Sequence, residues 1–212
     1  MMFGRKKTTL VEPQDALPGR DTRPFEVGTD NLVLGTPMEA AVPDGFQEVV
    51  VGLGCFWGEE KTFWEAPGVW TTAVGYAGGV TPNPTYDEVC TGMTGHAEVV
   101  RVVFDPKVLP FEQVLRIFWE NHDPTQGMRQ GNDVGTQYRS VMYTTTPEQQ
   151  ELAEKSREVY QRDMTARGYG EITTAILPLE HFWYAESVHQ QYLAKNPFGY
   201  CPLHATGVAY SG

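Results

Sequence analysis

From Phe46 onward the chain alternates between strand-like and helix-like patterns, and this alternation constrains its fold more than any other feature. Runs rich in β-branched residues predict strands, and amphipathic segments between them predict helices. We expect strands over residues 46–53, 69–75, 97–105, 138–144 and 171–179. We expect helices over residues 57–66, 83–90, 110–122, 146–167 and 185–196, the second of them opened by Asn83 with Pro84 at its first position. This order predicts a sheet covered by helices, and it leaves open whether the sheet is parallel or mixed.

Residues 1–45 differ in composition from the rest of the chain. They are rich in Pro, Asp, Thr and Gly and show no sustained periodicity, so we expect an extended arm that lies across the domain. A chain of 212 residues suits one main domain with a substantial core. We assign that domain to residues 46–212, including a mobile C-terminal tail from about residue 197 to residue 212.

The charge and the cysteine content exclude several classes of protein. A net charge of −11 disfavours a sequence-independent grip on nucleic acid or docking on an anionic membrane. No apolar run is long enough for a membrane span, and no secretory signal is expected at the N-terminus. The chain has three scattered cysteines, too few for a secreted disulfide framework. We therefore expect a cytoplasmic monomer, in which any disulfide is catalytic rather than structural.

Cys55 stands in the sequence GLGCFWGEE, where an expected strand gives way to an expected helix. Free N–H groups at a helix start favour the thiolate, so this cysteine is a candidate nucleophile. Gly52 and Gly54 allow a tight turn there. Packing of the sulfur beside Phe56 and Trp57 is the alternative, and position alone leaves the two interpretations nearly balanced.

The other two cysteines have different surroundings. Cys90 ends a short expected helix, where a small buried apolar residue is the better interpretation. Cys201 lies in the Gly- and Pro-containing tail, where a thiol contributes little packing but is free to reach another sulfur. A resolving thiol needs that freedom, and an inconsequential surface thiol is the alternative.

Glu98 is the most informative acidic residue. Strand alternation places Glu98 on the same face as Val100, Val102 and Phe104. A carboxyl held on that apolar face should have a raised pKa and act as a general acid. A glutamate that turns out to solvent at the strand end is an equally weighted alternative.

A loop of about fifteen residues without periodicity follows His122, and loops of that length are usually functional or disordered. Its Asp133 and Tyr138 are candidate polar contacts, as is Tyr86 ahead of Cys90. Taken singly, each of these three residues is better explained by a structural role.

Two functions are possible for a chain with these residues besides redox chemistry of its thiols. Cys55 with His96, His122 or His189 would make a cysteine hydrolase or acyltransferase, but no hydrolase signature accompanies it. A non-catalytic module that binds methionine-rich or oxidised proteins is the other. His-Ala-Glu at 96–98 echoes the zinc deaminases, yet no P-C-x-x-C follows, so no metal site is predicted.

Seven motifs together resemble the A-type peptide methionine sulfoxide reductases, over residues 46 to 201. These motifs are GCFWGEEKTFW, VGYAGG, NPTY, GHAEVVRVVFDP, FWENHDPTQ, QGNDVGTQYRS and HQQYLAKNPFGYC. The arm, in particular DALPGR, is similar to the N-terminal extension of longer bacterial members. The resemblance implies an α+β two-layer sandwich on a ferredoxin-like core, with a mixed sheet wrapped by long coil.

The resemblance also implies a reaction. The substrate would be the S epimer of methionine sulfoxide, free or in oxidised proteins, and the purpose would be protein repair. Cys55 would attack the sulfoxide sulfur while Glu98 protonates its oxygen, leaving a sulfenic acid on Cys55. Cys201 would resolve this to a disulfide, and thioredoxin, with no bound cofactor, would restore the thiols.

The same resemblance assigns the remaining site residues. Phe56 and Trp57 would form the pocket that receives the substrate methyl group. Tyr86 and Tyr138 would donate hydrogen bonds to the sulfoxide oxygen, and Asp133 would order the site.

The tail departs from the pattern of many bacterial relatives, which have a second tail cysteine that presents the disulfide to thioredoxin. The tail sequence PLHATGVAYSG after Cys201 contains none. We therefore expect thioredoxin to attack the Cys55–Cys201 bond directly, since the helix context of Cys90 makes it a poor substitute.

Overall fold

A six-stranded mixed sheet forms the centre of the molecule in the computed structural model, which describes residues 7–200 and 204–212. The strand order is β7-β6-β1-β3-β2-β8, and every neighbouring pair is antiparallel except β6 and β7. The strands are β1 (Gln47–Gly52), β2 (Val69–Ala77), β3 (Ala97–Phe104), β6 (Val141–Thr144), β7 (Ala175–Pro178) and β8 (Phe182–Tyr184). The open question of a parallel or mixed sheet is thus answered.

Strand β3 lies in the middle of this sheet and is buried along its whole length. Its Val100 pairs with Val51 of β1 on one side and with Val74 of β2 on the other. The predicted alternation is confirmed, because Val100, Val102 and Phe104 all join the main core. Residues of the opposite face, such as Val99, join a smaller cluster.

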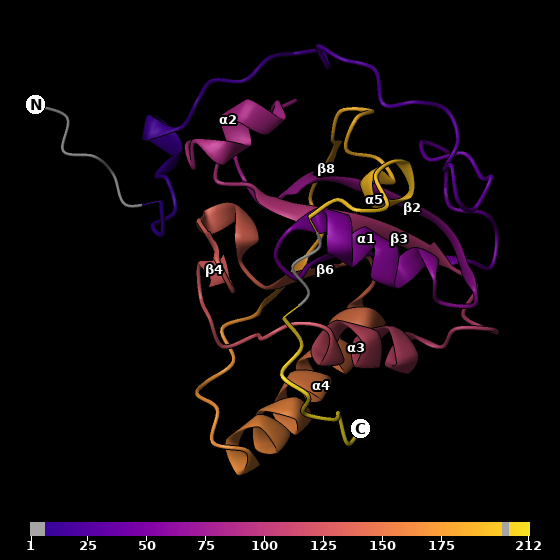
Figure 1. Cartoon of the computed structure of the whole chain (residues 1–212), viewed down its shortest axis with the longest axis vertical. Helices are drawn as coiled ribbons and strands as arrows, with labels where there is room; N and C mark the ends of the chain where they lie inside the picture. The colour runs from indigo at the N-terminus through magenta and orange to yellow at the C-terminus, as the bar shows by residue number, and fades with distance from the viewer. Residues whose placement is uncertain (1–6, 201–203) are drawn as a thin grey trace, which may run out of the picture.

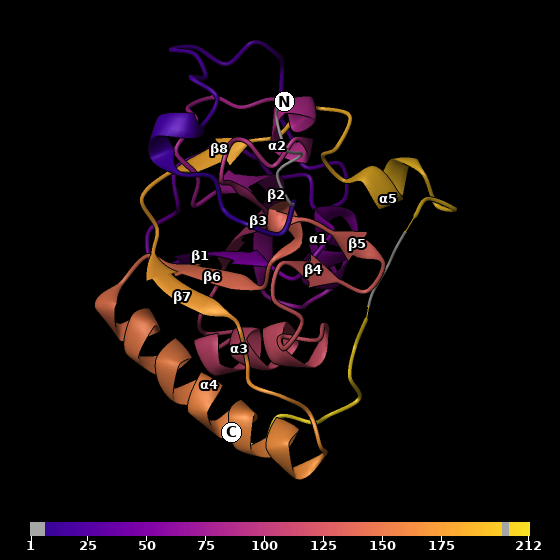
Figure 2. The same cartoon turned by 90° about the vertical axis from the view of Figure 1, so that its left-hand side faces the viewer.

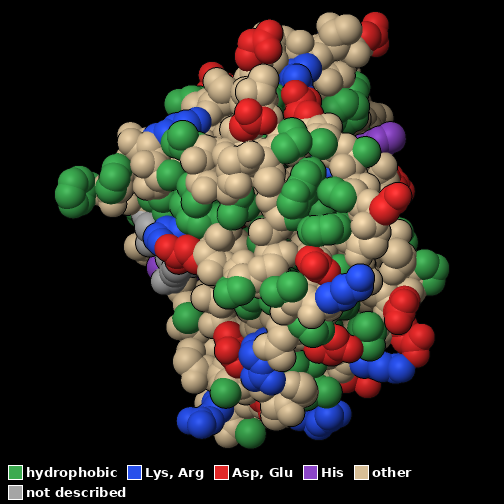
Figure 3. Space-filling model, turned by 90° about the vertical axis from the view of Figure 1, so that its right-hand side faces the viewer, with side chains coloured by type: hydrophobic (Ala, Val, Ile, Leu, Met, Phe, Trp, Pro, Cys, Tyr) green, Lys and Arg blue, Asp and Glu red, His purple; other side chains and the backbone are tan. Residues whose placement is uncertain are grey.

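Helices cover the main-core face of the sheet, which gives the two-layer α+β sandwich expected from the sequence (Figures 1 and 2). They are α1 (Phe56–Trp64), α2 (Tyr86–Cys90), α3 (Phe111–Glu120), α4 (Pro147–Ala166) and the short α5 (Tyr192–Lys195), with 3-10 turns at Pro13–Asp15 and Thr136–Tyr138. Phe118 and Trp119 of α3 are fully buried, and the Trp119 indole donates to Ser156 Oγ of α4. Charged side chains of both signs cover the helical end of the molecule (Figure 3). No helix within the described ranges has the length and apolarity of a membrane span.

The predicted helix over residues 185–196 is wrong, because only α5 is helical there. Gln191 has a left-handed backbone with φ of 46°, which ends a right-handed helix. The side chain of Gln190 instead bonds both the N–H and the carbonyl of Val74 in β2. Tertiary hydrogen bonds have therefore replaced helical ones.

Three smaller differences concern where short elements begin and which of them form. Helix α2 begins at Tyr86 rather than Asn83, because Thr85 and Glu88 form a capping box. The long loop after His122 contains a two-stranded hairpin, β4 (Arg129–Gln130) with β5 (Asp133–Val134). Strand β8 was not predicted, and it pairs with the end of β2.

The arm crosses the sheet edge and the top of the domain (Figure 1). Val27 and Met38 are buried within it. Arg101 of β3 donates to the carbonyls of Met38 and Ala40 at 2.9 and 3.2 Å, and it forms an ion pair with Glu48. The arm thus supplies acceptors to a buried cation of the central strand.

The C-terminal segment from His204 lies along α3 and α4 (Figure 2). Arg116 of α3 donates to the Tyr210 and Gly212 carbonyls, and Tyr160 of α4 donates to the Val208 carbonyl. The end of the chain is therefore held against the helical layer.

We predict that Phe118→Ala lowers the free energy of unfolding by about 3–5 kcal/mol, since it leaves a cavity where α3 meets the sheet. Urea denaturation measures the change. Val108→Ala is the control, because Val108 is 59% exposed and its loss should cost no more than about 0.5 kcal/mol. Equal losses in the two variants would contradict this assignment of the core.

Candidate active site

Cys55 is the N-cap residue of α1 and follows the tight turn that ends β1. Gly54 in this turn has φ of 133°, and a Cβ there would lie 2.8 Å from the Gln130 side chain. Glycine is therefore required by both the backbone and the space. The sequence prediction of a strand, a turn and a helix around Cys55 is confirmed.

The Glu98 carboxyl lies directly against this turn. Glu98 is 1% exposed, and its Oε2 accepts from the backbone N–H of Phe56 at 3.2 Å. Its Oε1 is buried without a hydrogen-bond partner among the described residues. Burial raises the pKa of Glu98 to about 8, a change that the Phe56 N–H opposes. The expected rise in pKa is thus confirmed, and the solvent-facing alternative is wrong.

The helix start acts on the pKa of Cys55 in the expected direction, but burial outweighs it. Burial raises the pKa of the Cys55 thiol, and the nearby carboxyls of Glu98, Glu59 and Asp133 raise it further. The N–H of Trp57 acts in the predicted direction but does not outweigh desolvation. Burial therefore favours the thiol form of Cys55, and ionised carboxyls nearby add to this effect.

Glu59 is a second buried carboxyl at the site that sequence reasoning missed. It is 2% exposed and accepts from the N–H of Leu53, on the other side of the Cys55 turn. Burial raises its pKa well above the usual range, and Glu98 adds to the rise. The position of Glu59 in the sequence did not indicate its burial, because an acidic residue in the first turn of a helix usually faces solvent.

Aromatic rings form one wall of the site. The Phe56 ring lies 6.4 Å from that of Trp57 and 6.4 Å from that of Tyr86. Tyr192, which sequence reasoning missed, stacks on Trp57 with ring centroids 3.9 Å apart. His189 Nδ1 accepts from the Trp57 indole N–H at 3.3 Å, and the centroid of its ring lies 4.4 Å from that of Tyr86. The predicted pair Phe56 and Trp57 thus belongs to a larger aromatic cluster.

The remaining predicted polar residues come from the long loop. Tyr138 ends a 3-10 turn, and burial raises the pKa of its hydroxyl, with a further rise from the charge of Glu98. Asp133 accepts from the Tyr200 hydroxyl at 3.2 Å, and its Oδ2 is buried without a partner in the described ranges. The fold therefore brings Cys55, Glu98, Tyr138 and Asp133 into one electrostatic neighbourhood.

The two remaining cysteines have different outcomes. Cys90, expected to be buried packing, is half-buried at the end of α2, and its thiol bonds the Tyr86 hydroxyl. Cys201 lies outside the described residues. Its chain neighbour Tyr200 donates to Asp133 of β5 at 3.2 Å.

None of the three histidines raised as partners pairs with Cys55 in the described part of the chain. The ring nitrogens of His96 contact Gly79 N and Thr81 O, and those of His122 contact Phe118 O and Ser140 Oγ. Burial lowers the pKa of each to about 4. With His189 bonded to Trp57, the hydrolase arrangement is not formed.

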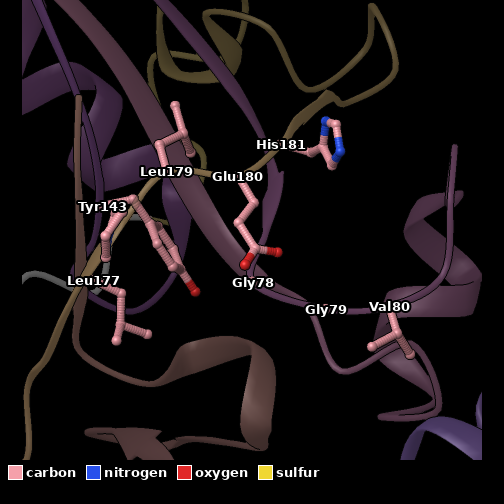
Figure 4. A pocket seen from close by; sticks show the side chains of 9 residues that line it. Gly78, Gly79, Val80, Tyr143, Leu177, Leu179, Glu180 and His181 are labelled. Atoms are coloured by element: carbon pink, nitrogen blue, oxygen red, sulfur yellow. The ribbon is translucent and has the colours of Figure 1, made fainter.

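A separate cavity of about 280 Å³ lies between the β2–α2 loop and the segment that joins β7 to β8 (Figure 4). Its lining residues are Gly78, Gly79, Val80, Tyr143, Leu177, Pro178, Leu179, Glu180 and His181. Tyr143 and Glu180 point toward the backbone of Gly78 (Figure 4). The cavity contains none of the predicted site residues. No group of His, Cys, Asp and Glu within residues 7–200 and 204–212 has the arrangement of a metal site.

A thiol at a helix start lies beside a buried carboxyl with a raised pKa and an aromatic wall, which is the arrangement of an enzyme with a reactive cysteine on an α+β scaffold. The family profile described as peptide methionine sulfoxide reductase matches residues 47–209. The chain belongs to the peptide methionine sulfoxide reductase family, and it is an oxidoreductase of that kind, as its motifs indicate.

Individual relatives agree with this assignment. The peptide methionine sulfoxide reductase MsrA of Brucella anthropi is 58% identical over 205 residues, covering 97% of this chain and 94% of that protein. The solved methionine sulfoxide reductase A of Corynebacterium diphtheriae is 50% identical, with a TM-score of 0.86 over 95% of this chain and 97% of its own. Mxr1 from Saccharomyces cerevisiae in reduced form is 36% identical, with a TM-score of 0.69 over 76% of this chain and 92% of its own. Mxr1 has also been solved in complex with Trx2, a structure that matches at 24% identity and a TM-score of 0.51 over 76% of this chain and 90% of that one.

We predict that Glu98→Gln lowers the pKa of the Cys55 thiol, since it removes a nearby negative charge that disfavours the thiolate. The ultraviolet absorbance of the thiolate, followed against pH in the Cys90→Ser, Cys201→Ser background, measures it. Glu65→Gln, at the other end of α1, is the control and should leave the titration unchanged. A pKa that is equal in both variants would contradict the coupling between Glu98 and Cys55.

Proposed function

We propose that the protein reduces the S epimer of methionine sulfoxide, free or within oxidised proteins, with Cys55 as nucleophile and Glu98 as general acid. The observation on which this rests is the buried Glu98 carboxyl, held against the Cys55 turn by the Phe56 N–H. Its raised pKa keeps it largely protonated at neutral pH. Repair of oxidised proteins would be the biological result.

In the first step the Cys55 sulfur attacks the sulfoxide sulfur while Glu98 gives its proton to the sulfoxide oxygen. The hydroxyl then passes from the substrate sulfur to the Cys55 sulfur. The substrate S–O bond and the transient bond between the two sulfurs break, a Cys55 S–O bond forms, methionine leaves, and Cys55 is left as a sulfenic acid. The hydrogen of the Cys55 thiol replaces the proton that Glu98 gave, so the carboxyl ends the step as it began. Loss of the Glu98 negative charge on protonation also favours the Cys55 thiolate, which couples the two groups.

The substrate side chain would lie against the aromatic wall. Phe56 and Trp57 would contact the methyl group, and the hydroxyls of Tyr86 and Tyr138 would donate to the oxygen. Both hydroxyls keep their protons at neutral pH, as tyrosine hydroxyls ordinarily do, and burial raises the pKa of each further, so each can donate. Asp133 would order the site through Tyr200.

Recycling would follow in two exchanges. The Cys201 thiol would attack the sulfenic sulfur of Cys55, releasing water and forming a Cys55–Cys201 disulfide. Thioredoxin would reduce this disulfide to two thiols and itself become oxidised. The complex of the relative Mxr1 with Trx2 supports such a partner. We further propose that residues 46–212 form the catalytic domain and that the protein acts as a cytoplasmic monomer.

We predict that Cys201→Ser retains about one equivalent of methionine per enzyme but loses thioredoxin-driven turnover, since only the resolving step is removed. Quantification of methionine from a sulfoxide peptide, with and without thioredoxin, measures both. Cys90→Ser is the matched control and should cycle normally, whereas Cys55→Ser should form no methionine. Normal cycling by Cys201→Ser would rule out its resolving role.

We predict that Glu98→Gln slows the single-turnover reduction by about 10²–10⁴-fold, the usual contribution of general acid catalysis. In the unmodified protein this rate should fall as the pH rises through about 8, because the acid loses its proton. Rapid mixing of enzyme and sulfoxide peptide across this range measures both effects. An unchanged rate in Glu98→Gln would exclude the acid role.

A further inference from the structure

Gln191 joins three parts of the molecule that are distant in sequence. It is 1% exposed, and its backbone N–H and side-chain Nε2 both donate to the Glu60 carboxylate at 2.8 Å. Its Oε1 accepts from the N–H of Leu32 in the arm at 3.1 Å, and its Nε2 also contacts Met38 Sδ at 3.4 Å. One amide thus connects α1, the arm and the segment before α5.

The next residue along the chain is Tyr192, which stacks on Trp57 at 3.9 Å. Gln191 has the left-handed φ of 46° that is uncommon for a residue with a side chain. Because this conformation costs energy, the hydrogen bonds around it must hold it in place. The direction in which Tyr192 leaves the backbone therefore depends on the contacts of Gln191.

The acceptor in this arrangement lies on the same helix as the aromatic wall. Glu60 follows Trp57 by three residues in α1, so the two side chains share one side of the helix. Glu60 is fully buried and accepts from Gln191 and from Thr72 Oγ1 at 3.0 Å. Burial raises the pKa of Glu60 to about 7, and these donors oppose the rise.

The arm completes the arrangement on its outer side. Asn31 donates to the Thr72 carbonyl at 3.0 Å and to Thr72 Oγ1 at 2.9 Å. Asn31 also accepts from the N–H groups of Val33 and Leu34, which fixes the turn containing Leu32. The arm is therefore hydrogen-bonded to the same cluster that holds Tyr192 against Trp57.

We propose that Gln191 is a positioning residue for the sulfoxide pocket, and that the arm and Glu60 act through it to hold Tyr192 against Trp57. This inference rests on the proposed role of Trp57 in the methyl pocket. It gives residues 1–45 a part in the site, because the arm closes the outer side of the hydrogen-bond cluster. Loss of Gln191 should weaken sulfoxide binding and leave the chemical groups at Cys55 and Glu98 intact.

The test uses the full chain and a sulfoxide peptide under single-turnover conditions. Gln191→Ala should raise the half-saturation concentration about tenfold, since it removes the side-chain hydrogen bond to the Glu60 carboxyl, and leave the limiting rate within about twofold. Thr72→Val keeps the side-chain volume and removes one donor to Glu60, so it should raise the half-saturation concentration by a smaller factor. A fall in the limiting rate without a change in half-saturation, in both variants, would overturn the proposal.

Exchange of the carboxyl and the amide between Glu60 and Gln191 tests whether Gln191 positions the pocket or only stabilises the fold. Glu60→Gln combined with Gln191→Glu restores one carboxylate facing one amide, so the double variant should recover most of the affinity that Gln191→Glu loses. Gln149→Ala is the matched control, because Gln149 is a buried amide at the start of α4 that bonds Glu48 and touches neither arm nor pocket. Half-saturation in Gln149→Ala should match the unmodified protein, and a rise equal to that of Gln191→Ala would overturn the proposal.

Trp57→Ala distinguishes this inference from the function on which it rests. If Trp57→Ala leaves half-saturation unchanged, the pocket assignment is wrong, and with it this inference. If Trp57→Ala raises the half-saturation concentration and neither Gln191→Ala nor Thr72→Val does, the assignment of Trp57 to the pocket holds and the positioning role of Gln191 is wrong.

Discussion

The contact between the Glu98 carboxyl and the Phe56 N–H is the interaction on which the rest of the site depends. It joins the central strand β3 to the first turn of α1, and it holds an acid beside a thiol in a buried place. Burial keeps that acid protonated near neutral pH and also keeps the thiol protonated. Ionisation of either group disfavours ionisation of the other, so the Cys55 thiolate forms most readily beside a protonated Glu98, the state in which the carboxyl can give its proton to a substrate.

The scaffold keeps this contact precise because both partners lie on rigid elements. Strand β3 is paired on both sides, and Gly54 allows the chain to turn so closely that the Gln130 side chain fills the space beside it. The aromatic wall is held differently, since Tyr192 begins the short helix α5 directly after the left-handed residue Gln191. Its position depends on hydrogen bonds from the arm and from α1, which explains why an extended segment outside the sheet bears on the pocket.

Local patterns predicted much of this arrangement because they reflect local physics. The alternation on β3 follows from strand geometry, so it placed Glu98 among apolar residues correctly. The helix start at Cys55 was also found, but its effect on the thiol was not. A helix dipole acts over one turn, whereas desolvation and three carboxyls drawn from α1, β3 and β5 act only after the chain has folded. The helix predicted over residues 185–196 was wrong for the same reason, since the Gln190 side chain bonds β2 and the Gln191 N–H and side chain bond Glu60 of α1.

The sequence by itself determined the five longer strands, the helices α1 to α4, the family and the candidate residues Cys55, Glu98, Phe56 and Trp57, because each is encoded in a short stretch of chain. The tertiary structure alone decided that Glu59 is a second buried carboxyl and that His96 and His122 are hydrogen-bonded to groups other than Cys55. It also decided that Gln191 bonds the arm. These outcomes depend on contacts between side chains that are far apart in the sequence. The pKa and hydrogen bonds of a buried polar group are set only when the folded chain has brought its neighbours next to it.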